Sequence, residues 1–281
     1  MNSCRNFYLR NERLILGIAV VIAFLLFWEG LARGWWADLL RPLIGAGADK
    51  LKVRPIFLSS PSAVAAEAWR LYVTTGEIWP HLAVSGMELV IGLGAAILVG
   101  IPLGLITGRY RLLSYAVEPF MSALNATPQV AFIPLIILWM GTGYVTRIFI
   151  IFLLTVIPIF ISAHAAVRTV DVRLLKMASS FGASEGLLFR TIVLPGSVPF
   201  LLTGIRLAIG RAMIGIIVGE LFGSALGLGL MINYAGSTFK TNTVFVGVVT
   251  IIVVGMALTE LVQRIETRVE AWRPRAQDAV E

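Results

Sequence analysis

Residues 176–199 read KMASSFGASEGLLFRTIVLPGSVP, and they interrupt a chain that is otherwise strongly apolar. Runs of Ile, Leu, Val and Phe lie on both sides, whereas this stretch carries small, polar and basic residues together with helix signals. Gly182 can supply the positive φ at which a helix ends, and Ser184 can cap the start of another helix. The stretch therefore predicts two short helices joined by a turn, between two long apolar segments.

Asp171 is placed to cap the first of these helices, which we expect to run from Val172 to Phe181. Pro195 and Pro199 close the segment before the next apolar run. Apolar side chains gather on one side of each helix: Leu174, Leu175, Ala178 and Phe181 on the first, and Leu187, Leu188 and Ile192 on the second. An amphipathic knob that docks into a partner and a loop packed without a partner both fit this pattern.

The composition of the whole chain indicates an all-α integral membrane protein. Of its 281 residues, 58% are hydrophobic and only 14% are charged, whereas a soluble domain has about 45–50% apolar and about 25% charged residues. A helix needs roughly 20 apolar residues to cross a bilayer. Six stretches meet this length, at 14–33, 82–107, 113–140, 145–167, 198–222 and 244–263.

Basic residues indicate the orientation of these spans, because they collect in cytoplasmic loops. Beyond the second span, the proposed inner side carries Arg109, Arg111, Arg168, Arg173, Lys176, Arg190, Arg264, Arg268, Arg273 and Arg275, and the proposed outer side carries Arg147 and Lys240. Both termini and the loop 168–197 are therefore expected in the cytoplasm. The loop 34–81 would place five basic residues outside, but the rule gives long loops less weight.

The predicted layout has four parts: residues 1–33 with the first span, an extracytoplasmic loop at 34–81, a membrane core at 82–263, and a cytoplasmic tail at 264–281. A cleavable signal peptide is an alternative for the first apolar run. In the outer loop, Ser60 and Pro61 predict the start of a short amphipathic helix lying on the membrane surface. Its apolar face would comprise Val64, Ala68, Leu71 and Tyr72.

Pro119, Pro128 and Pro134 make the third span the least regular one. Proline frees backbone carbonyls, which at membrane depth must face protein or water rather than lipid. A broken helix beside a transport pathway and a plain kink packed against its neighbours both satisfy this requirement.

Small residues recur along two spans and let helix backbones approach closely. They are Gly92, Ala96, Gly100, Gly104 and Gly108 in the second span, and Gly204, Ala208, Ala212, Gly215, Gly219 and Gly223 in the fifth. Packing inside one bundle is the expected use, and a seam between subunits is the alternative.

Polar residues inside the spans are candidates for a solute pathway, because a charge at the bilayer centre costs roughly 2.5–3.5 kcal/mol. The candidates are Asn125, Gln129, Arg211 and Glu220. We expect Arg211 to line the pathway and to favour an anionic solute. A structural ion pair with another span, for example with Glu88, is the alternative. Glu220 is about 13 Å further along the same helix, too far for a direct pair with Arg211.

Several chemistries are not expected in this chain. The sequence has no G-x-x-x-x-G-K-[ST] loop that would hold ATP phosphates. Cys4 is the only cysteine, and His81 and His164 lack a metal-binding spacing, so we expect neither a disulfide, a metal site nor an enzyme active site. The net charge of +7 comes largely from cytoplasmic loops and does not require nucleic acid. A proton-coupled secondary transporter, with Glu88 or Glu220 as the proton site, remains an alternative.

The interrupting segment resembles the cytoplasmic loop of bacterial ABC importer permeases, whose pattern is E-A-A-x3-G-x9-I-x-L-P. The matching residues are Ala178, Gly182, Ile192, Leu194 and Pro195. The family glutamate and first alanine fall on Lys176 and Met177, which puts in doubt any salt bridge carried over to this loop. The resemblance covers residues 58–272 and is closest to the branch that imports nitrate, sulfonates, taurine and some pyrimidine precursors. LSSPSAV, GIPLGLITGR, PLIILWMGTG, GASEGLLFRTIVLPGSVPFLLTGIRLAIG and GELFGSALGLG carry it.

This resemblance implies a type I ABC importer-like permease in a bacterial inner membrane. Its partners would be a second permease copy, two cytoplasmic ATPase subunits that bind ATP and Mg, and an extracytoplasmic solute-binding protein. The 171–195 loop would be the coupling helix that docks into the ATPase. The residues assigned to this contact are Lys176, Met177, Ala178, Gly182, Ala183, Ile192, Leu194 and Pro195.

Overall fold

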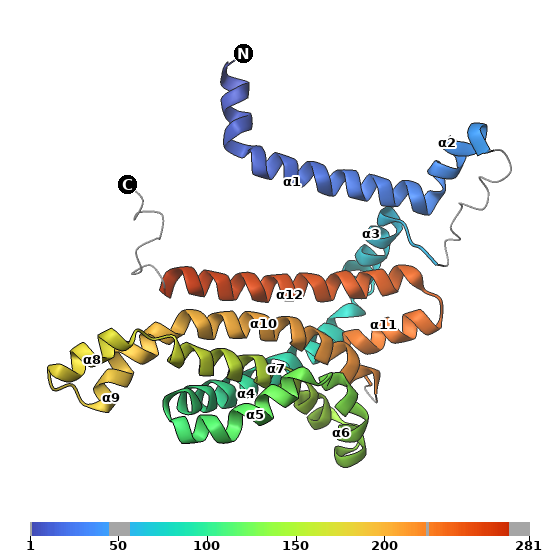
Figure 1. Cartoon of the computed structure of the whole chain (residues 1–281). Coiled ribbons are helices and arrows are strands. Elements are labelled where there is room, and N and C mark those ends of the chain that lie inside the picture. The colour runs from blue at the N-terminus through green and yellow to red at the C-terminus, as the bar shows by residue number, and fades with distance from the viewer. Residues whose placement is uncertain (1, 45–56, 223–224, 270–281) are drawn as a thin grey trace. The chain divides into compact units, whose positions relative to one another are not determined.

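The structure is a computed structural model, and it describes residues 2–44, 57–222 and 225–269 (Figure 1). Its long helices are α1 (Asn2–Arg33), α4 (Ile78–Arg109), α7 (Tyr144–Arg168), α10 (Leu194–Leu221) and α12 (Thr241–Val269). Its shorter helices are α2 (Trp35–Ile44), α3 (Pro61–Trp69), α5 (Arg111–Ala126), α6 (Ile133–Met140), α8 (Val172–Ser180), α9 (Glu185–Leu188) and α11 (Leu228–Ser237). The all-α prediction is confirmed for the described residues.

The chain divides into two compact units, one formed by residues 1–78 and 231–249 and the other by residues 79–230 and 250–281. In the first unit, Ser60 caps α3 as predicted, since its hydroxyl accepts a hydrogen bond from the Ala63 amide at 3.3 Å. The Glu29 carboxylate of α1 accepts a hydrogen bond from the Ser62 amide at 3.0 Å. Thr243 of α12 donates one to Glu67 at 2.7 Å. These contacts attach α3 to two other helices of its own unit.

Five helices are long and apolar enough to cross a membrane: 15–33 of α1, and α4, α7, the α9–α10 stretch and α12. A sixth candidate is the pair formed by α5 and residues 129–140, which is bent by 92°. The bend lies at Pro128, where Thr127 is extended with ψ 139°. The residue before a proline avoids the helical region, which explains why α5 ends at Ala126. The predicted break in the third span is thus confirmed, although α4 begins four residues before the expected start.

Helix α7 lies at the centre of the second unit, with α4 on one side and α10 on the other. A Cβ at Gly104 of α4 would lie 2.6 Å from the Phe160 carbonyl oxygen of α7, and one at Gly92 would lie 2.8 Å from the Ile151 side chain. On α10, Gly215 faces the Ile151 backbone in the same way. These small residues therefore let the helices pack closely inside one bundle. Gly223, the last residue of the set, lies outside the described residues.

Two helices were not expected from the sequence. Helix α2 follows α1 directly after Gly34, whose φ is +76°. Helix α11 occupies part of the stretch between the fifth and sixth spans, and its buried residues Leu228, Met231 and Ala235 recur at helical spacing. This spacing could have predicted α11, although the segment is too short to span a membrane.

Candidate functional site

The interrupting segment folds into the predicted pair of helices. The Asp171 carboxylate caps α8 by accepting a hydrogen bond from the Arg173 amide at 2.8 Å. The Ser184 hydroxyl caps α9 by accepting one from the Leu187 amide at 3.4 Å. Gly182 has φ +80° between them. We call residues 171–188, which comprise α8, the turn and α9, the knob.

The turn of the knob is a Schellman motif. The Ala183 amide donates to the Ala178 carbonyl at 3.2 Å, and the Gly182 amide donates to the Ser179 carbonyl at 3.0 Å. Three of the residues assigned to the ATPase contact, Ala178, Gly182 and Ala183, therefore shape the turn itself. A non-glycine residue at Gly182 would carry a backbone strain of about 1–2 kcal/mol.

Helix α9 continues into α10 without a loop, through the single π-helical turn Phe189–Val193. Leu188 and Val193 are buried at this junction. Arg109, the last residue of α4, pairs with Glu185 at 3.3 Å. Ile192, Leu194 and Pro195 lie in this junction and at the start of α10. The knob is thus attached directly to a membrane helix.

The outer face of the knob is apolar and exposed. Phe181 is 85% exposed, Met177 56% and Leu187 52%. No residue of α8 is buried. Figure 1 shows α8 and α9 projecting past the ends of α5 and α7 of their own unit. Contiguous exposed apolar residues on a polar segment typically mark a site of protein contact.

A second cluster gathers three of the predicted pathway residues. The Arg211 guanidinium of α10 donates to the Asn125 side-chain oxygen at 3.3 Å and to the Gln129 side-chain oxygen at 3.5 Å. Asn125 lies at the end of α5 and Gln129 in the 3-10 turn 129–132. The break in the third span therefore brings two amides next to one arginine.

Asn125 also lines a cavity of about 480 Å³ between α5 and α7. Glu118 and Arg168 form an ion pair at 3.4 Å in its wall. The other lining residues are Met121, Ser122, Ala126, Phe160, Ile161, His164, Ala165 and Thr169. The cluster around Arg211 thus adjoins a hollow that has apolar walls and a few polar groups.

Glu88 is not the partner of Arg211, which corrects one expectation from the sequence. Its carboxylate pairs with Arg147 of α7 at 2.7 Å, and Glu88 is fully buried. A buried charge needs a partner because desolvation otherwise costs several kcal/mol. The ion pair therefore joins α4 to α7 inside the bundle. Arg206, in the middle of α10, pairs with Glu266 of α12.

Glu220, the fourth predicted pathway residue, does not join the Arg211 cluster. It is fully buried, and its carboxylate accepts hydrogen bonds from the Ser85 hydroxyl and the Gly229 amide, each at 2.5 Å. The Ser85 oxygen also accepts from the Leu228 amide at 2.8 Å. This network attaches the start of α11 to α4. The sequence analysis did not predict this network. Glu220 is a charged residue followed by a glycine-rich stretch, and that pattern could have indicated a buried carboxylate bound by backbone amides.

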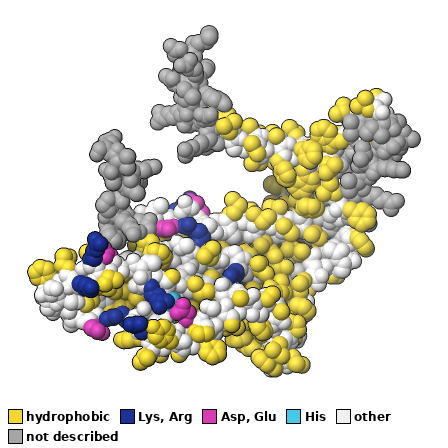
Figure 2. Space-filling view, in the orientation of Figure 1, with side chains coloured by type: hydrophobic (Ala, Val, Ile, Leu, Met, Phe, Trp, Pro, Cys, Tyr) yellow, Lys and Arg dark blue, Asp and Glu magenta, His cyan; other side chains and the backbone are white. Residues whose placement is uncertain are grey.

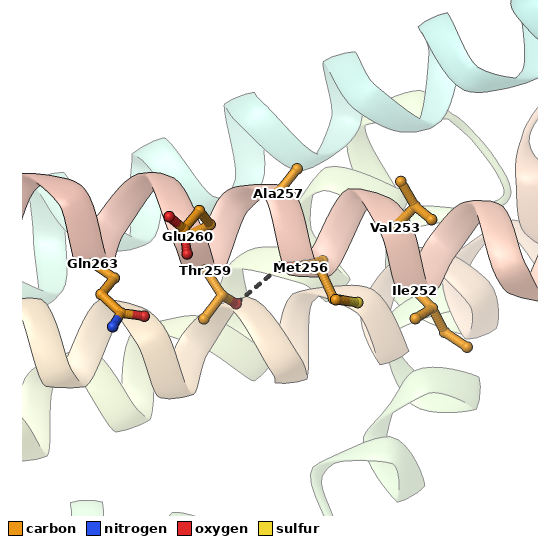
Figure 3. Close-up of a pocket in the computed structure, with 8 residues that line it drawn as sticks. Ile252, Val253, Met256, Ala257, Thr259, Glu260 and Gln263 are labelled. Atoms are coloured by element: carbon orange, nitrogen blue, oxygen red, sulfur yellow. Dashed lines mark hydrogen bonds between the residues drawn. The ribbon is translucent and has the colours of Figure 1, made fainter. Parts of the chain in front are cut away.

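Other parts of the described chain offer less. Within them, no group of three or more His, Cys, Asp or Glu side chains could hold a metal. Figure 3 shows a groove on α12 where Ile252, Met256, Thr259 and Gln263 point to one side of the helix. All of the residues that line this groove belong to α12, so no second element directs polar groups into it.

In the part of the chain that the structure describes, five or six membrane-spanning candidates, a polar cluster at a broken span and an exposed knob together fit a membrane transport subunit. Residues 100–271, more than half of the chain, match the family described as "Binding-protein-dependent transport system inner membrane component". The chain belongs to this family. It is the permease subunit of an ABC importer, as the resemblance of the knob predicted, and a proton-coupled transporter is not favoured.

Related permeases match along most of their length. The taurine transport system permease protein of Escherichia coli is 29% identical over 247 residues, which are 86% of each chain. The putative aliphatic sulfonates transport permease protein of the same organism is 33% identical over 77% of this chain and 82% of its own. The riboflavin transport system permease protein of Chloroflexus aurantiacus is 30% identical over 94% and 92%.

A solved structure has the same fold. The inward-facing MetNI methionine ABC transporter contains a chain that matches with a TM-score of 0.52 and 18% sequence identity, over 70% of this chain and 98% of that one. This likeness confirms the predicted type I importer architecture.

Proposed function

We propose that this permease forms, with a second copy of itself, the pathway for a small anionic solute, and that two ATPase subunits drive it through the knob. Family membership implies an ATP-binding partner and a solute-binding protein. The sequence supplies no P-loop, so the energy of ATP must enter from another subunit. The proposed orientation places both termini and the knob in the cytoplasm and the 34–81 segment outside.

The observation that carries the coupling role is the knob itself. Its apolar face is exposed, its turn is fixed by Gly182, and α9 leads into α10 through one π-helical turn. A rigid element seated in a partner's cleft can convert closure of that partner into a rotation of attached helices. The same helix carries Arg211, so movement of the knob reaches the polar cluster.

The solute class rests on Arg211. A guanidinium binds sulfonate or carboxylate oxygens through parallel hydrogen bonds, and the two amides already placed beside it can orient the same group. Relatives named for taurine and aliphatic sulfonates support this assignment. We therefore propose a small sulfonate-type anion as the solute.

The coupling proposal is tested by capture of the ATPase subunit on the immobilised permease, comparing wild type with Gly182→Arg. The variant is expected to lose capture, because an arginine at φ +80° strains the turn that orients both helices. Gly141→Arg is the matched control, since Gly141 has φ +74° at the end of α6, outside the knob. Equal capture by wild type and Gly182→Arg would contradict docking through the knob.

A further inference from the structure

We infer that the knob fits a groove with an acidic rim on the ATPase subunit. This inference rests on the proposed docking function and adds the chemistry of the partner surface. It starts from three cations, Arg173, Lys176 and Arg190, all exposed. Within the described chain, none of them has a carboxylate within ion-pair distance, whereas seven other arginines do.

The acidic residues of the knob are already engaged. Asp171 holds the first turn of α8 through the Arg173 amide, and Glu185 pairs with Arg109 of α4. Both acidic side chains are exposed but have partners, so the charges of this surface that lack a carboxylate or other ion-pair partner among the described residues are the positive ones. Figure 2 shows dark-blue cationic groups beside yellow apolar side chains over the end of the unit where α8 and α9 lie in Figure 1.

Arg173 and Lys176 lie along one edge of an apolar ridge, which Met177 and Phe181 form on the outer face of the knob. Arg173 and Lys176 are three positions apart on α8, which makes them neighbours on the helix surface. Met177 is four positions from Arg173, and Phe181 follows one turn later, so the ridge runs beside the pair. Leu175 and Ala178 occupy the opposite, half-buried side. A groove that takes up Met177 and Phe181 would bring Arg173 and Lys176 to its rim.

Charge complementarity determines which charge the rim of the partner's groove must carry. Like charges facing each other across an interface cost several kcal/mol, whereas opposite charges favour encounter and fix the register. Two neighbouring cations on a docking edge therefore require carboxylates on the partner. Because both side chains are exposed, the attraction should weaken when salt shortens the Debye length to about 3 Å at 1 M.

The test measures binding of the ATPase subunit to the full-length permease in nanodiscs, at about 50 mM and about 500 mM NaCl. Lys176→Glu is expected to weaken binding about tenfold or more at low salt, with a smaller difference at high salt. Lys240→Glu, a charge reversal at an exposed residue between α11 and α12, is the matched control and should bind as the wild type does. Thermal unfolding of each variant checks that the fold is unchanged.

Phe181→Ala separates this inference from the docking proposal. Loss of binding in Phe181→Ala with unchanged or tighter binding in Lys176→Glu would overturn the acidic rim and leave docking through the knob intact. Unchanged binding in both variants would overturn docking and the acidic rim together. Weaker binding in both variants, with the salt dependence given above, would support both.

Discussion

The close approach of α4 to α7 makes Gly104→Ala the most informative substitution in the bundle. A Cβ at this position would lie 2.6 Å from the Phe160 carbonyl oxygen and 3.0 Å from the His164 amide nitrogen. Ordinary contacts of this kind begin at 3.4 Å, so the two backbones would have to separate by about 0.8 Å. The Cβ of Ala163 lies nearer still, at 2.5 Å. Two of these three atoms belong to the main chain and the third is bonded directly to it, so none can rotate away as the end of a long side chain would.

Gly94→Ala on the same helix isolates this effect, because a Cβ at Gly94 meets nothing within 4 Å. Replacing a helical glycine by alanine gains about 0.5–1 kcal/mol, and this gain is common to both variants. The difference between them is therefore the cost of overpacking, about 1–3 kcal/mol. Gly94→Ala should be as stable as the wild type or more stable, and Gly104→Ala less stable than Gly94→Ala.

The assay is unfolding of the purified permease by SDS in mixed micelles, followed by tryptophan fluorescence. We expect the midpoint of Gly104→Ala to lie well below that of Gly94→Ala. Equal midpoints would refute the close packing of α4 on α7 and, with it, the use of these glycines inside one bundle.

Three further substitutions test the polar contacts. Glu88→Gln should destabilise the permease by about 3–5 kcal/mol in the same assay, because it breaks a buried ion pair by removing the charge of one member; an unchanged midpoint would show that the pair contributes little. Arg211→Gln should lower uptake of an anionic solute about ten- to hundredfold, corresponding to the loss of a charged hydrogen bond, while assembly with the ATPase is kept; normal uptake would exclude Arg211 from the pathway. Glu220→Gln should speed hydrogen exchange at the Gly229 amide, since a glutamine at this position keeps only one acceptor oxygen; unchanged exchange would mean that the carboxylate does not hold α11.

The knob was predictable because its signals are local. The Asp171 and Ser184 caps and the positive φ of Gly182 each act within a few residues, and all three are present in the structure. The spans follow from apolar length, and the break in the third span follows from Pro128. The outcome confirms that capping and proline effects persist in a chain whose packing is otherwise apolar.

The polar pairings were harder to predict because they join residues far apart in the chain. Glu88 of α4 pairs with Arg147 of α7, and Glu220 contacts Ser85, which lies 135 positions away in the sequence. A single sequence indicates that a buried charge needs a partner, but it does not indicate which helix supplies that partner. The sequence named Asn125, Gln129, Arg211 and Glu220 as candidates, but it did not show that Arg211 contacts the two amides or that Glu220 contacts Ser85.

The loop-free passage from the knob through the π-helical turn Phe189–Val193 into α10 makes that helix a lever. Leu194 and Arg211 are 17 positions apart, which corresponds to about 26 Å of helix. A tilt of about 10° applied at the knob end would displace the arginine by about 4.5 Å, if the helix turns as one piece about that end. This displacement exceeds the reach of a hydrogen bond. A small movement of a cytoplasmic partner would thus be enough to take the guanidinium away from one set of oxygens and present it to another.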